Sequence, residues 1–502
     1  MLEANRGAPT APIPFGGAGP VRGRLGGTIV EIDDAFLSRL RSACAEVSTE
    51  PALVAESSRD WWPLAMTWAV DGQAPAVAAA VARPASVGEV AAVVRVCNDG
   101  RVPVTAAAGR SGVCGASVPV HGGVVLDLGR LAGIVEVDDE SMVLDVRPGT
   151  FGDVLEDELR ASHDATCGHW PQSMALSTVG GWLACRGAGQ LSTRYGKIED
   201  IVAGLEVVLA DGRVIRTGGA PRAAVGPDLT QVFVGSEGTL GVITEAWLRL
   251  HPAPPAERRS AWALPSFSAG LEVCRQVLRR GATPAVLRLY DETETKRSFD
   301  LDTNALIVLD EGDDELIFAV MQIVESECVA AGAEPLDVEL VEKWMDHRND
   351  VSALESLVAN GFVVDTIEVA ARWRDLDALY HEVLATLTAV DGVLAASAHQ
   401  SHSYSDGACL YFTFAGRPDP DPKVKDAFYV ACWDAATRAV LARGGALSHH
   451  HGVGLNRSRF VADALGPAFD VLVALKKALD PNGVLNPGKL GLPDPFGPVG
   501  WP

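Results

Sequence analysis

The amino-acid sequence predicts a globular protein of the α/β or α+β class with two or three lobes. The chain has 502 residues, more than one ordinary hydrophobic core accommodates. Hydrophobic residues make up 48% of it and it contains 51 glycines, as expected of a globular protein with many loops. Patterns typical of helices and of strands alternate along most of its length.

The first lobe is expected to follow a Gly- and Pro-rich stretch at 7–27, which is typical of a flexible or extended lead-in. Prolines between 252 and 255 indicate a linker at its end. Its predicted elements are a helix at 84–100, strands at 102–109, 122–128 and 141–150, a helix at 150–164, a hairpin with an Asp-Gly turn at 205–218 and a strand at 242–252.

Residues 256–440 are expected to form a second α/β lobe, followed by a histidine triplet and a C-terminal tail. The predicted helices lie at 268–281, about 315–332, about 374–389 and, beyond this lobe, at 469–480. The predicted strands lie at 285–290, 304–310 and 408–414.

Charge and cysteine content exclude several classes of protein. The net charge of −23 argues against binding to nucleic acid, although a local cluster of cations can still hold an anionic substrate. The nine cysteines are odd in number and include no CxxC pair, so neither a zinc site nor a disulfide framework is expected. The start MLEANRGAPT lacks a signal-peptide core and no run of about 18 apolar residues occurs, so we expect a cytoplasmic protein without a membrane span.

Three glycine-rich loops carry the chemical information. The first, AAAGRSGVCGASVP at 106–119, matches neither GxGxxG nor GxxxxGK[ST], so it predicts neither a Rossmann site nor a P-loop. Its backbone N–H groups are suited to phosphate oxygens, although an ordinary turn explains it equally well. The second, at 168–202, has few large apolar side chains before Ile198, as expected of backbone lying against a planar ligand. The third, VGSEGTLGVITE at 234–245, again permits close approach.

In this order and spacing the loops resemble the FAD-binding domain of the vanillyl-alcohol oxidase / p-cresol methylhydroxylase family. Within that family the likeness is closest to the alkyldihydroxyacetonephosphate synthases and their bacterial FAD-linked oxidase relatives, and it covers residues 58–491. The motifs that carry it are PASVGEVAAVV, STVGGW, RGAGQLSTRYGKIEDIV, SEGTLGVITEA, DGACLYFTF, SHHHGVG and LDPNGVLNPGKL.

The resemblance implies an α+β fold of the p-cresol methylhydroxylase type, in which two subdomains hold an extended FAD under an α/β cap. It implies a partly flexible lead-in at 1–57, an FAD-binding domain at 58–252, a cap at 253–440, a C-terminal segment at 441–491 that completes the active site, and a tail at 492–502. It also implies a homodimer, because dimers are common among such proteins.

The resemblance also names the residues expected to contact FAD. The pyrophosphate would lie on the first loop, the ribityl chain and the isoalloxazine ring on the second, and the adenine half and the ring on the third. These residues are Ala108, Gly109, Arg110, Ser111, Gly112, Val113, Pro171, Ser173, Ser177, Thr178, Gly180, Gly181, Tyr195, Glu237, Gly238, Leu240, Gly241 and Val242. Cys114 lies near the position of the flavin bond in covalent members, but a buried Cys also packs as a plain hydrophobe.

The triplet His449, His450 and His451 is predicted to be catalytic or substrate-contacting. In an extended segment His449 and His451 would share one face and His450 would point the other way. No second cluster with ligand spacing accompanies them, so no metal site is expected. Imidazoles titrate near neutral pH and exchange protons, and the resemblance implies that the triplet lies near the flavin.

Tyr411 and Arg288 are the other candidates. The resemblance implies that Tyr411 acts as an acid or base, although a strand aromatic facing a core is an equal alternative. Arg288 matches an arginine of the synthases and interrupts an apolar strand, where a buried cation needs a partner. That partner is a carboxylate or phosphate of the substrate, or else Asp291 or another neighbouring acid.

Two departures from the synthase pattern argue against an acyl-glycerone-phosphate substrate. Glu355 stands where the pattern has a phosphate-binding arginine, for which Arg348 would compensate, and Leu455 replaces the lysine of HHHGVGK. Losing two charge-assisted phosphate contacts costs about 1.5–3 kcal/mol each.

The favoured function is therefore an FAD-dependent oxidoreductase that oxidises a small hydroxyl-bearing molecule, such as a 2-hydroxy acid, by hydride transfer to flavin N5. The alternative is a transferase resembling alkylglycerone-phosphate synthase, in which FAD mediates a non-redox exchange of acyl and alkoxy groups. A flavin-free binding protein that kept the fold is the least favoured alternative.

Overall fold

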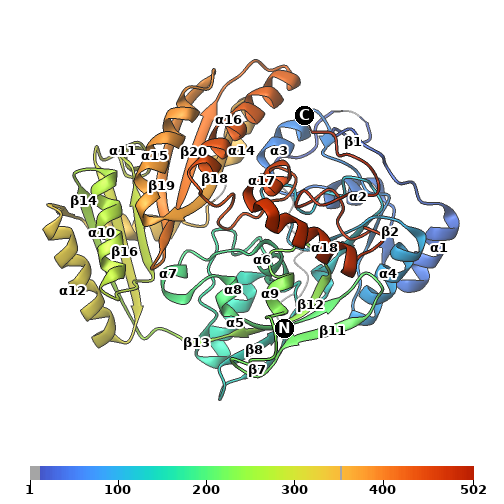
Figure 1. The fold of residues 1–502 in the computed structure, drawn as a ribbon, viewed down its shortest axis with the longest axis horizontal. Coiled ribbons are helices and arrows are strands. Elements are labelled where there is room, and N and C mark those ends of the chain that lie inside the picture. Colours follow the sequence, from blue (N-terminus) through green and yellow to red (C-terminus); the bar gives the residue numbers. More distant parts are fainter. Residues whose placement is uncertain (1–11, 18, 351–352, 502) are drawn as a thin grey trace.

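Three β-sheets organise the molecule. The computed structural model describes residues 12–17, 19–350 and 353–501. In Figure 1 the first sheet lies in the blue part of the molecule, the second in the green part, and the third in the yellow and orange part. The first two sheets form two subdomains, and the third forms the cap.

The first subdomain has a four-stranded sheet with the order β2-β4-β6-β5. Its strands are Val47–Ser48, Ala80–Ala82, Val124–Asp127 and Val104–Ala107, of which the last three are parallel. Its helices are α1 (Asp34–Ala43), α2 (Pro51–Ser57), α3 (Pro63–Ala69) and α4 (Val87–Gly100). Helix α4 confirms a predicted helix: the Ser86 hydroxyl accepts from the Glu89 N–H at its start, and Arg101 in the left-handed region ends it.

The second subdomain has an antiparallel sheet with the order β11-β10-β12-β8-β7. Its strands are Val214–Gly218, Val202–Val208, Val242–Arg249, Val143–Val146 and Ile134–Asp138. Its helices are α5 (Gly152–His163), α6 (Val179–Cys185), α7 (Ser192–Tyr195), α8 (Ile198–Ile201) and α9 (Thr230–Phe233). The predicted hairpin is β10–β11, whose Asp-Gly turn closes with the Gly212 N–H donating to the Leu209 carbonyl.

The cap is a seven-stranded antiparallel sheet with the order β17-β14-β16-β15-β19-β20-β18. Its strands are Glu334–Leu336, Ala256–Leu264, Asn304–Gly312, Val286–Tyr290, Val393–Ser403, Gly407–Gly416 and Val363–Arg372. A row of four helices covers one face, namely α12 (Asp314–Ala330), α10 (Phe267–Arg279), α15 (Trp373–Thr388) and α16 (Pro422–Ala442) (Figure 1). The shorter helices are α11 (Glu292–Phe299), α13 (Glu339–His347) and α14 (Ala353–Ala359).

The C-terminal segment returns from the cap to the first subdomain. Helices α17 (Val461–Leu465) and α18 (Phe469–Leu479) lie over the centre of the molecule, in red in Figure 1. The Val104 N–H then donates to the Val484 carbonyl, which joins the chain end to strand β5. Residues far apart in sequence thereby meet at the centre.

The N-terminal lead-in is more ordered than its composition indicates. Residues 1–11 and 18, on which part of the expected flexible stretch falls, lie outside the described residues. In the described part, the Gly16 N–H donates to the Ala69 carbonyl, and β1 (Arg22–Gly23) pairs with β3 (Gln73–Ala74). Tertiary hydrogen bonds therefore order this segment, whose Gly and Pro content predicted a flexible or extended lead-in, in an extended form.

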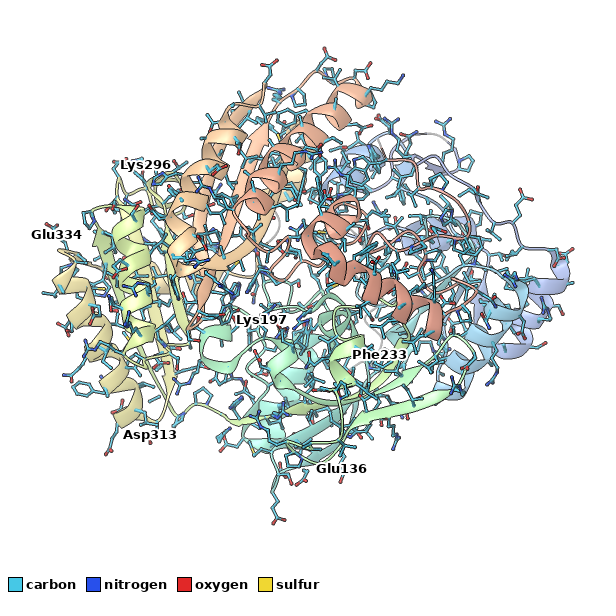
Figure 2. All side chains as sticks on the ribbon, viewed as in Figure 1. Glu136, Lys197, Phe233, Lys296, Asp313 and Glu334 are labelled. Carbon is cyan, nitrogen blue, oxygen red and sulfur yellow. The ribbon has the colours of Figure 1, made fainter. Side chains whose placement is uncertain are left out.

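Buried tryptophans join the cap to the first subdomain. Trp62 Nε1–H donates to the Tyr429 hydroxyl and Trp68 Nε1–H donates to Asp426, both on α16. Figure 2 shows the labelled charged residues Asp313 and Glu334 at the outer margin of the cap, whereas Lys197 lies near the centre. None of the helices in the described parts of the chain is long and apolar enough to cross a membrane.

Candidate active site

A cavity of about 990 Å³ lies where the cap meets the two subdomains. The three glycine-rich loops form one side, and the cap strands with the histidine triplet form the other. Of the residues predicted to contact FAD, those on the cavity wall are Ala108, Gly109, Arg110, Ser111, Gly112, Val113, Pro171, Ser173, Ser177, Thr178, Gly180, Gly181, Glu237, Gly238, Gly241 and Val242.

Two predicted FAD contacts lie away from the cavity and are corrected. The Tyr195 hydroxyl donates to Glu311 at 2.7 Å, and its ring packs on His251, so Tyr195 links the second subdomain to the cap. Leu240 is 1% exposed and belongs to the core of the second subdomain. Its apolar side chain turns inward between two glycines whose backbone reaches the wall.

The first loop brings a buried cation to the cavity. Arg110 adopts a positive φ of 51°, which is uncommon outside glycine and concentrates at functional sites. One guanidinium nitrogen lies 3.5 Å from Asp127 and has no hydrogen-bond partner among the described residues. A Cβ at Gly109 would lie 2.4 Å from the Leu176 carbonyl oxygen, so only glycine lets the first and second loops meet.

The second loop places buried, unsatisfied polar atoms in residues that line the cavity. The Thr178 hydroxyl, both ring nitrogens of His169 and Oε1 of Gln190 are buried without a hydrogen-bond partner in the described chain. The His169 ring lies 4.6 Å from the Trp182 ring, and burial lowers its pKa to about 3, so it is neutral. Such atoms are costly unless a polar ligand satisfies them, and this wall therefore fits a polar heterocycle.

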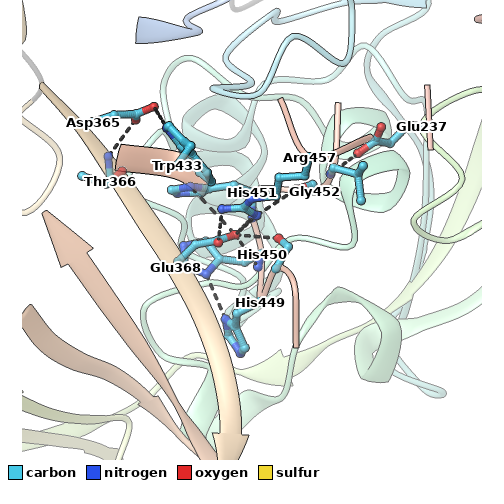
Figure 3. Close-up of polar contacts among 12 residues, drawn as sticks. Glu237, Asp365, Thr366, Glu368, Trp433, His449, His450, His451, Gly452 and Arg457 are labelled. Carbon is cyan, nitrogen blue, oxygen red and sulfur yellow. Dashed lines mark hydrogen bonds and ion pairs between the residues drawn. The ribbon is translucent and has the colours of Figure 1, made fainter. Parts of the chain in front are cut away.

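The third loop holds the glycines that follow the histidine triplet. Glu237 has a φ of 49°, and its carboxylate accepts from the backbone N–H groups of Val453 at 2.6 Å and Gly454 at 2.9 Å (Figure 3). Burial raises the pKa of Glu237. This contact ties the C-terminal segment to the FAD side of the cavity.

Glu368 on strand β18 holds the triplet itself (Figure 3). Its Oε1 accepts from the backbone N–H groups of His450 at 3.0 Å and His451 at 2.5 Å, and from the Ser448 hydroxyl at 2.7 Å. Arg457 donates to both carboxylate oxygens, at 3.1 and 2.5 Å. Burial alone would raise the pKa of Glu368, but the charge of Arg457 and these hydrogen bonds outweigh it and lower the pKa to about 2.

The triplet forms a bend rather than an extended segment, so the alternation of side chains expected for an extended segment does not apply. Both backbone N–H groups turn toward one carboxylate, and Nδ1 of His449 lies 2.9 Å from Nδ1 of His450. His450 and His451 reach the cavity wall, whereas His449 lies behind it and is 7% exposed. Burial lowers the pKa of all three rings, which makes them neutral.

A row of polar side chains crosses the cap sheet. Tyr290, His399, Tyr411 and Glu368 are register partners on four adjacent strands, so their side chains share one face. The Tyr411 ring stacks on His399 at 4.8 Å and lines the cavity, and burial raises the pKa of its hydroxyl. Tyr411 therefore faces the cavity rather than a sealed core.

Arg288 is oriented by this row. Its Nε donates to the Tyr290 hydroxyl at 2.7 Å, and one terminal nitrogen lies 2.6 Å from Nε2 of His399. The other nitrogen of His399 lies 2.7 Å from Glu294. Burial alone would raise the pKa of Glu294, but its interactions with His399 and with the charge of Arg297 lower it to about 2. The fold thus provides a partner for Arg288 other than the neighbouring Asp291.

The positions that depart from the synthase pattern lie in different surroundings. Arg348 lines the cavity and stacks over the rings of Trp170 and Trp344, at 5.0 and 5.4 Å. Glu355 is exposed on α14. Leu455 is 4% exposed and packs in the cap core.

Several polar residues of the site were not predicted from the sequence. They are His169, Gln190, Glu294, Glu368, His399, His402 and Arg457. A local signal exists for two of them, His399 and His402, since HQSHS shortly before DGACLYF places two histidines within four residues. Cys114, by contrast, is a buried free thiol whose pKa burial raises, and it is not part of the cavity wall.

Comparison with known proteins agrees with this geometry. The model of an FAD binding domain matches residues 78–218, and that of the C-terminal domain of FAD linked oxidases matches residues 253–490. The uncharacterized FAD-linked oxidoreductase YgcU of Escherichia coli K12 is 31% identical over 82% of this chain and 89% of its own length. The alkyldihydroxyacetonephosphate synthase of Trypanosoma brucei is 30% identical over 74% of this chain and 65% of its own. Glycolate oxidase subunit GlcD of Bacillus subtilis is 28% identical over 82% and 88%.

Solved structures show the same fold. An alkyldihydroxyacetonephosphate synthase matches with a TM-score of 0.77 and 23% identity, over 95% of this chain and 90% of that chain. A p-cresol methylhydroxylase matches with a TM-score of 0.76 and 18% identity, over 93% and 99%. The predicted α+β fold of the p-cresol methylhydroxylase type is confirmed.

The matching family models and relatives identify an FAD-dependent oxidoreductase. More narrowly, the chain belongs to the FAD-linked oxidases of the vanillyl-alcohol oxidase / p-cresol methylhydroxylase family, whose members include the alkyldihydroxyacetonephosphate synthases. Its cofactor is FAD, and the glycine cradle and the unsatisfied polar atoms of the wall fit that group.

Proposed function

We propose that the enzyme oxidises a small anionic substrate that carries a hydroxyl group, of the 2-hydroxy acid type. The observation that carries the proposal is Arg288. It lines the cavity, hydrogen bonds hold its guanidinium in place, and it forms no ion pair with any described residue. A carboxylate of the substrate is the natural partner for such a cation.

A neutral imidazole in the same cavity as Arg288 is suited to accept the hydroxyl proton. His451 lines this cavity, and burial keeps its ring in the neutral form that accepts a proton. Tyr411 lines it as well, and its protonated hydroxyl is suited to donate a hydrogen bond to the substrate. FAD supplies the hydride acceptor when it is bound. The task of the chain is then to orient the anion through Arg288 and to remove the proton.

Similarity to glycolate oxidase subunit GlcD and to YgcU supports the oxidoreductase. Similarity to alkyldihydroxyacetonephosphate synthase, with Tyr411, Arg288 and the triplet retained, supports the transferase as second candidate. The surroundings of Glu355 and Leu455 oppose it, because neither position offers a cation for a phosphate.

Anaerobic absorbance spectroscopy tests the proposal. The purified protein is mixed with a panel of hydroxy acids, alcohols and an acyl-glycerone phosphate. We expect a hydroxy acid to bleach the flavin band and oxygen or an electron acceptor to restore it. Bleaching by none of the hydroxy compounds, with a perturbed spectrum on adding the acyl-glycerone phosphate, would favour the transferase.

A cytoplasmic homodimer is part of the same proposal. The nine cysteines are free, which agrees with a reducing compartment. Light scattering on the purified protein measures its mass directly, and a monomer would remove this part of the proposal.

A further inference from the structure

Three histidines beside the cavity have the composition of a metal site. His402 from β19 joins His449 and His450, and one ring nitrogen from each lies within 4.8 Å of the other two. A shift of register between Gln400 and His402 makes His402 the partner of Cys409, which places its side chain on the same face as Tyr411. The sequence could not show this group, because a regular strand would turn His402 away.

A hydroxyl group lies within hydrogen-bond distance of one ring nitrogen of His402 and of one ring nitrogen of His449. Nδ1 of His402 lies 2.8 Å from the Ser192 hydroxyl, and Nε2 of His449 lies 3.0 Å from the Tyr404 hydroxyl. The two hydroxyls lie 3.1 Å apart. Histidines that bind a metal usually have their second nitrogen held in this way, which fixes the ring and its tautomer.

The group is open on one side only. His402 and His450 line the cavity, whereas His449 is buried behind them. An ion here would have three protein ligands and one position toward the cavity, the arrangement of catalytic rather than structural zinc sites. The three ligands are all imidazoles, with no carboxylate among them, and the Lys197 ammonium lies close by and donates to the His449 carbonyl at 2.7 Å. A set of nitrogen ligands binds transition metals such as zinc better than it binds magnesium or calcium, which prefer oxygen ligands.

We propose that His402, His449 and His450 bind a divalent transition metal, with zinc as the simplest occupant. Its open position would take a hydroxyl or carboxylate oxygen of the substrate, in the same cavity as Arg288. The binding of a substrate oxygen to the metal rests on the proposed function, whereas the binding of the metal itself does not. The proposal replaces the expectation, based on the triplet alone, that the chain has no metal site.

Metal uptake by the full-length, FAD-loaded protein tests the proposal. The protein is stripped with a chelator and dialysed against zinc, and bound zinc is measured by mass spectrometry. We expect about one zinc per chain. His402→Gln should weaken binding by at least about 100-fold, and Tyr404→Phe, which removes only an outer partner, by about tenfold.

The matched control is His381→Gln, because His381 is an exposed histidine on α15 outside the cavity. It should bind zinc like the wild type. Equal zinc uptake by His402→Gln and the wild type would overturn the proposal, as would a wild type that takes up none.

Cobalt provides a second measurement that needs no folded His402 variant. We expect ligand-field absorption from the cobalt-loaded wild type at wavelengths beyond the flavin band, with the intensity of a four-coordinate site. A spectrum like that of cobalt in buffer would also overturn the proposal. Both measurements omit substrate, so a protein that binds no metal would still be compatible with the proposed oxidation. Likewise, a protein that oxidises no hydroxy acid would still be compatible with metal binding.

Discussion

Two buried carboxylates, Asp365 and Glu368, lie three residues apart on strand β18 (Figure 3). Their pKa values are shifted in opposite directions. Burial raises the pKa of Asp365 to about 7, because the groups that bind its carboxylate most closely are neutral: the Tyr429 hydroxyl at 2.5 Å and Trp433 Nε1–H at 3.1 Å. Glu368 is buried as deeply, but Arg457 outweighs burial and lowers its pKa to about 2. Burial does not decide the charge of a carboxylate; its partner does.

The difference separates two roles within one strand. Glu368 is a permanent anion that orients the backbone of the triplet, so its charge belongs to the architecture of the site. Asp365 is mostly protonated below about pH 7 and joins β18 to helix α16. Glu294 is a third case, because its charge reaches the cavity through His399 to Arg288.

Removing the charge of Glu368 is expected to give the largest effect. Glu368→Gln leaves Arg457 buried without an anion, which costs about 3–5 kcal/mol of the free energy of unfolding. Urea denaturation monitored by circular dichroism measures this loss. Glu355→Gln on the exposed surface of α14 should change the midpoint little.

The double variant Glu368→Gln, Arg457→Met sharpens the comparison. It removes both charges, so it should recover part of the stability that the single variant loses. A single variant as stable as the wild type would show that the pair does not hold the triplet.

Removing Arg288 is expected to affect the substrate more than the fold. Arg288→Gln keeps a polar side chain but loses the charge-assisted contact with an anion, worth about 1.5–3 kcal/mol, or roughly 10–150-fold in affinity. Anaerobic titration of a bleaching hydroxy acid measures the affinity, and Arg258→Gln, on the outer face of the cap, is the control. Unchanged affinity would contradict the assignment of Arg288.

The sequence predicted those helices and strands whose periodicity or turn residues lie within a short stretch of the chain. The helices α4, α5, α10 and α15 and the hairpin β10–β11 lie where periodicity and turn residues put them. Strand β19 was missed because its second half, HQSHS, is polar, although tertiary contacts bury it. One of its polar side chains, His399, belongs to the row that crosses the cap sheet, and together they carry no strand pattern.

The site was predictable only in part, for a related reason. The glycine loops could be recognised because close approach demands glycine, which leaves a mark in the sequence. Glu368, Glu294 and Arg457 leave no such mark, because any surface strand or helix contains similar charged residues. Their roles arise from pairing across strands and from the return of the C-terminal segment, which only the fold reveals.

The smallest expected effect concerns Asp365 and the dependence of the free energy of unfolding on pH. Asp365 has its pKa raised from 3.8 to about 7, so it contributes stability that is fully present below the ordinary pKa and is lost as the pH rises through about 7. Between about pH 6 and about pH 8 the wild type should therefore lose about 1 kcal/mol more of its free energy of unfolding than Asp365→Asn, whose amide oxygen still accepts from Tyr429. Urea midpoints at the two pH values measure this, and titrating groups common to both proteins, such as Asp60, cancel in the difference. Glu368 contributes nothing in this window, because it stays ionised throughout. Parallel pH profiles for the two proteins would mean that Asp365 is already charged at pH 6, and that the contrast between the two carboxylates does not exist.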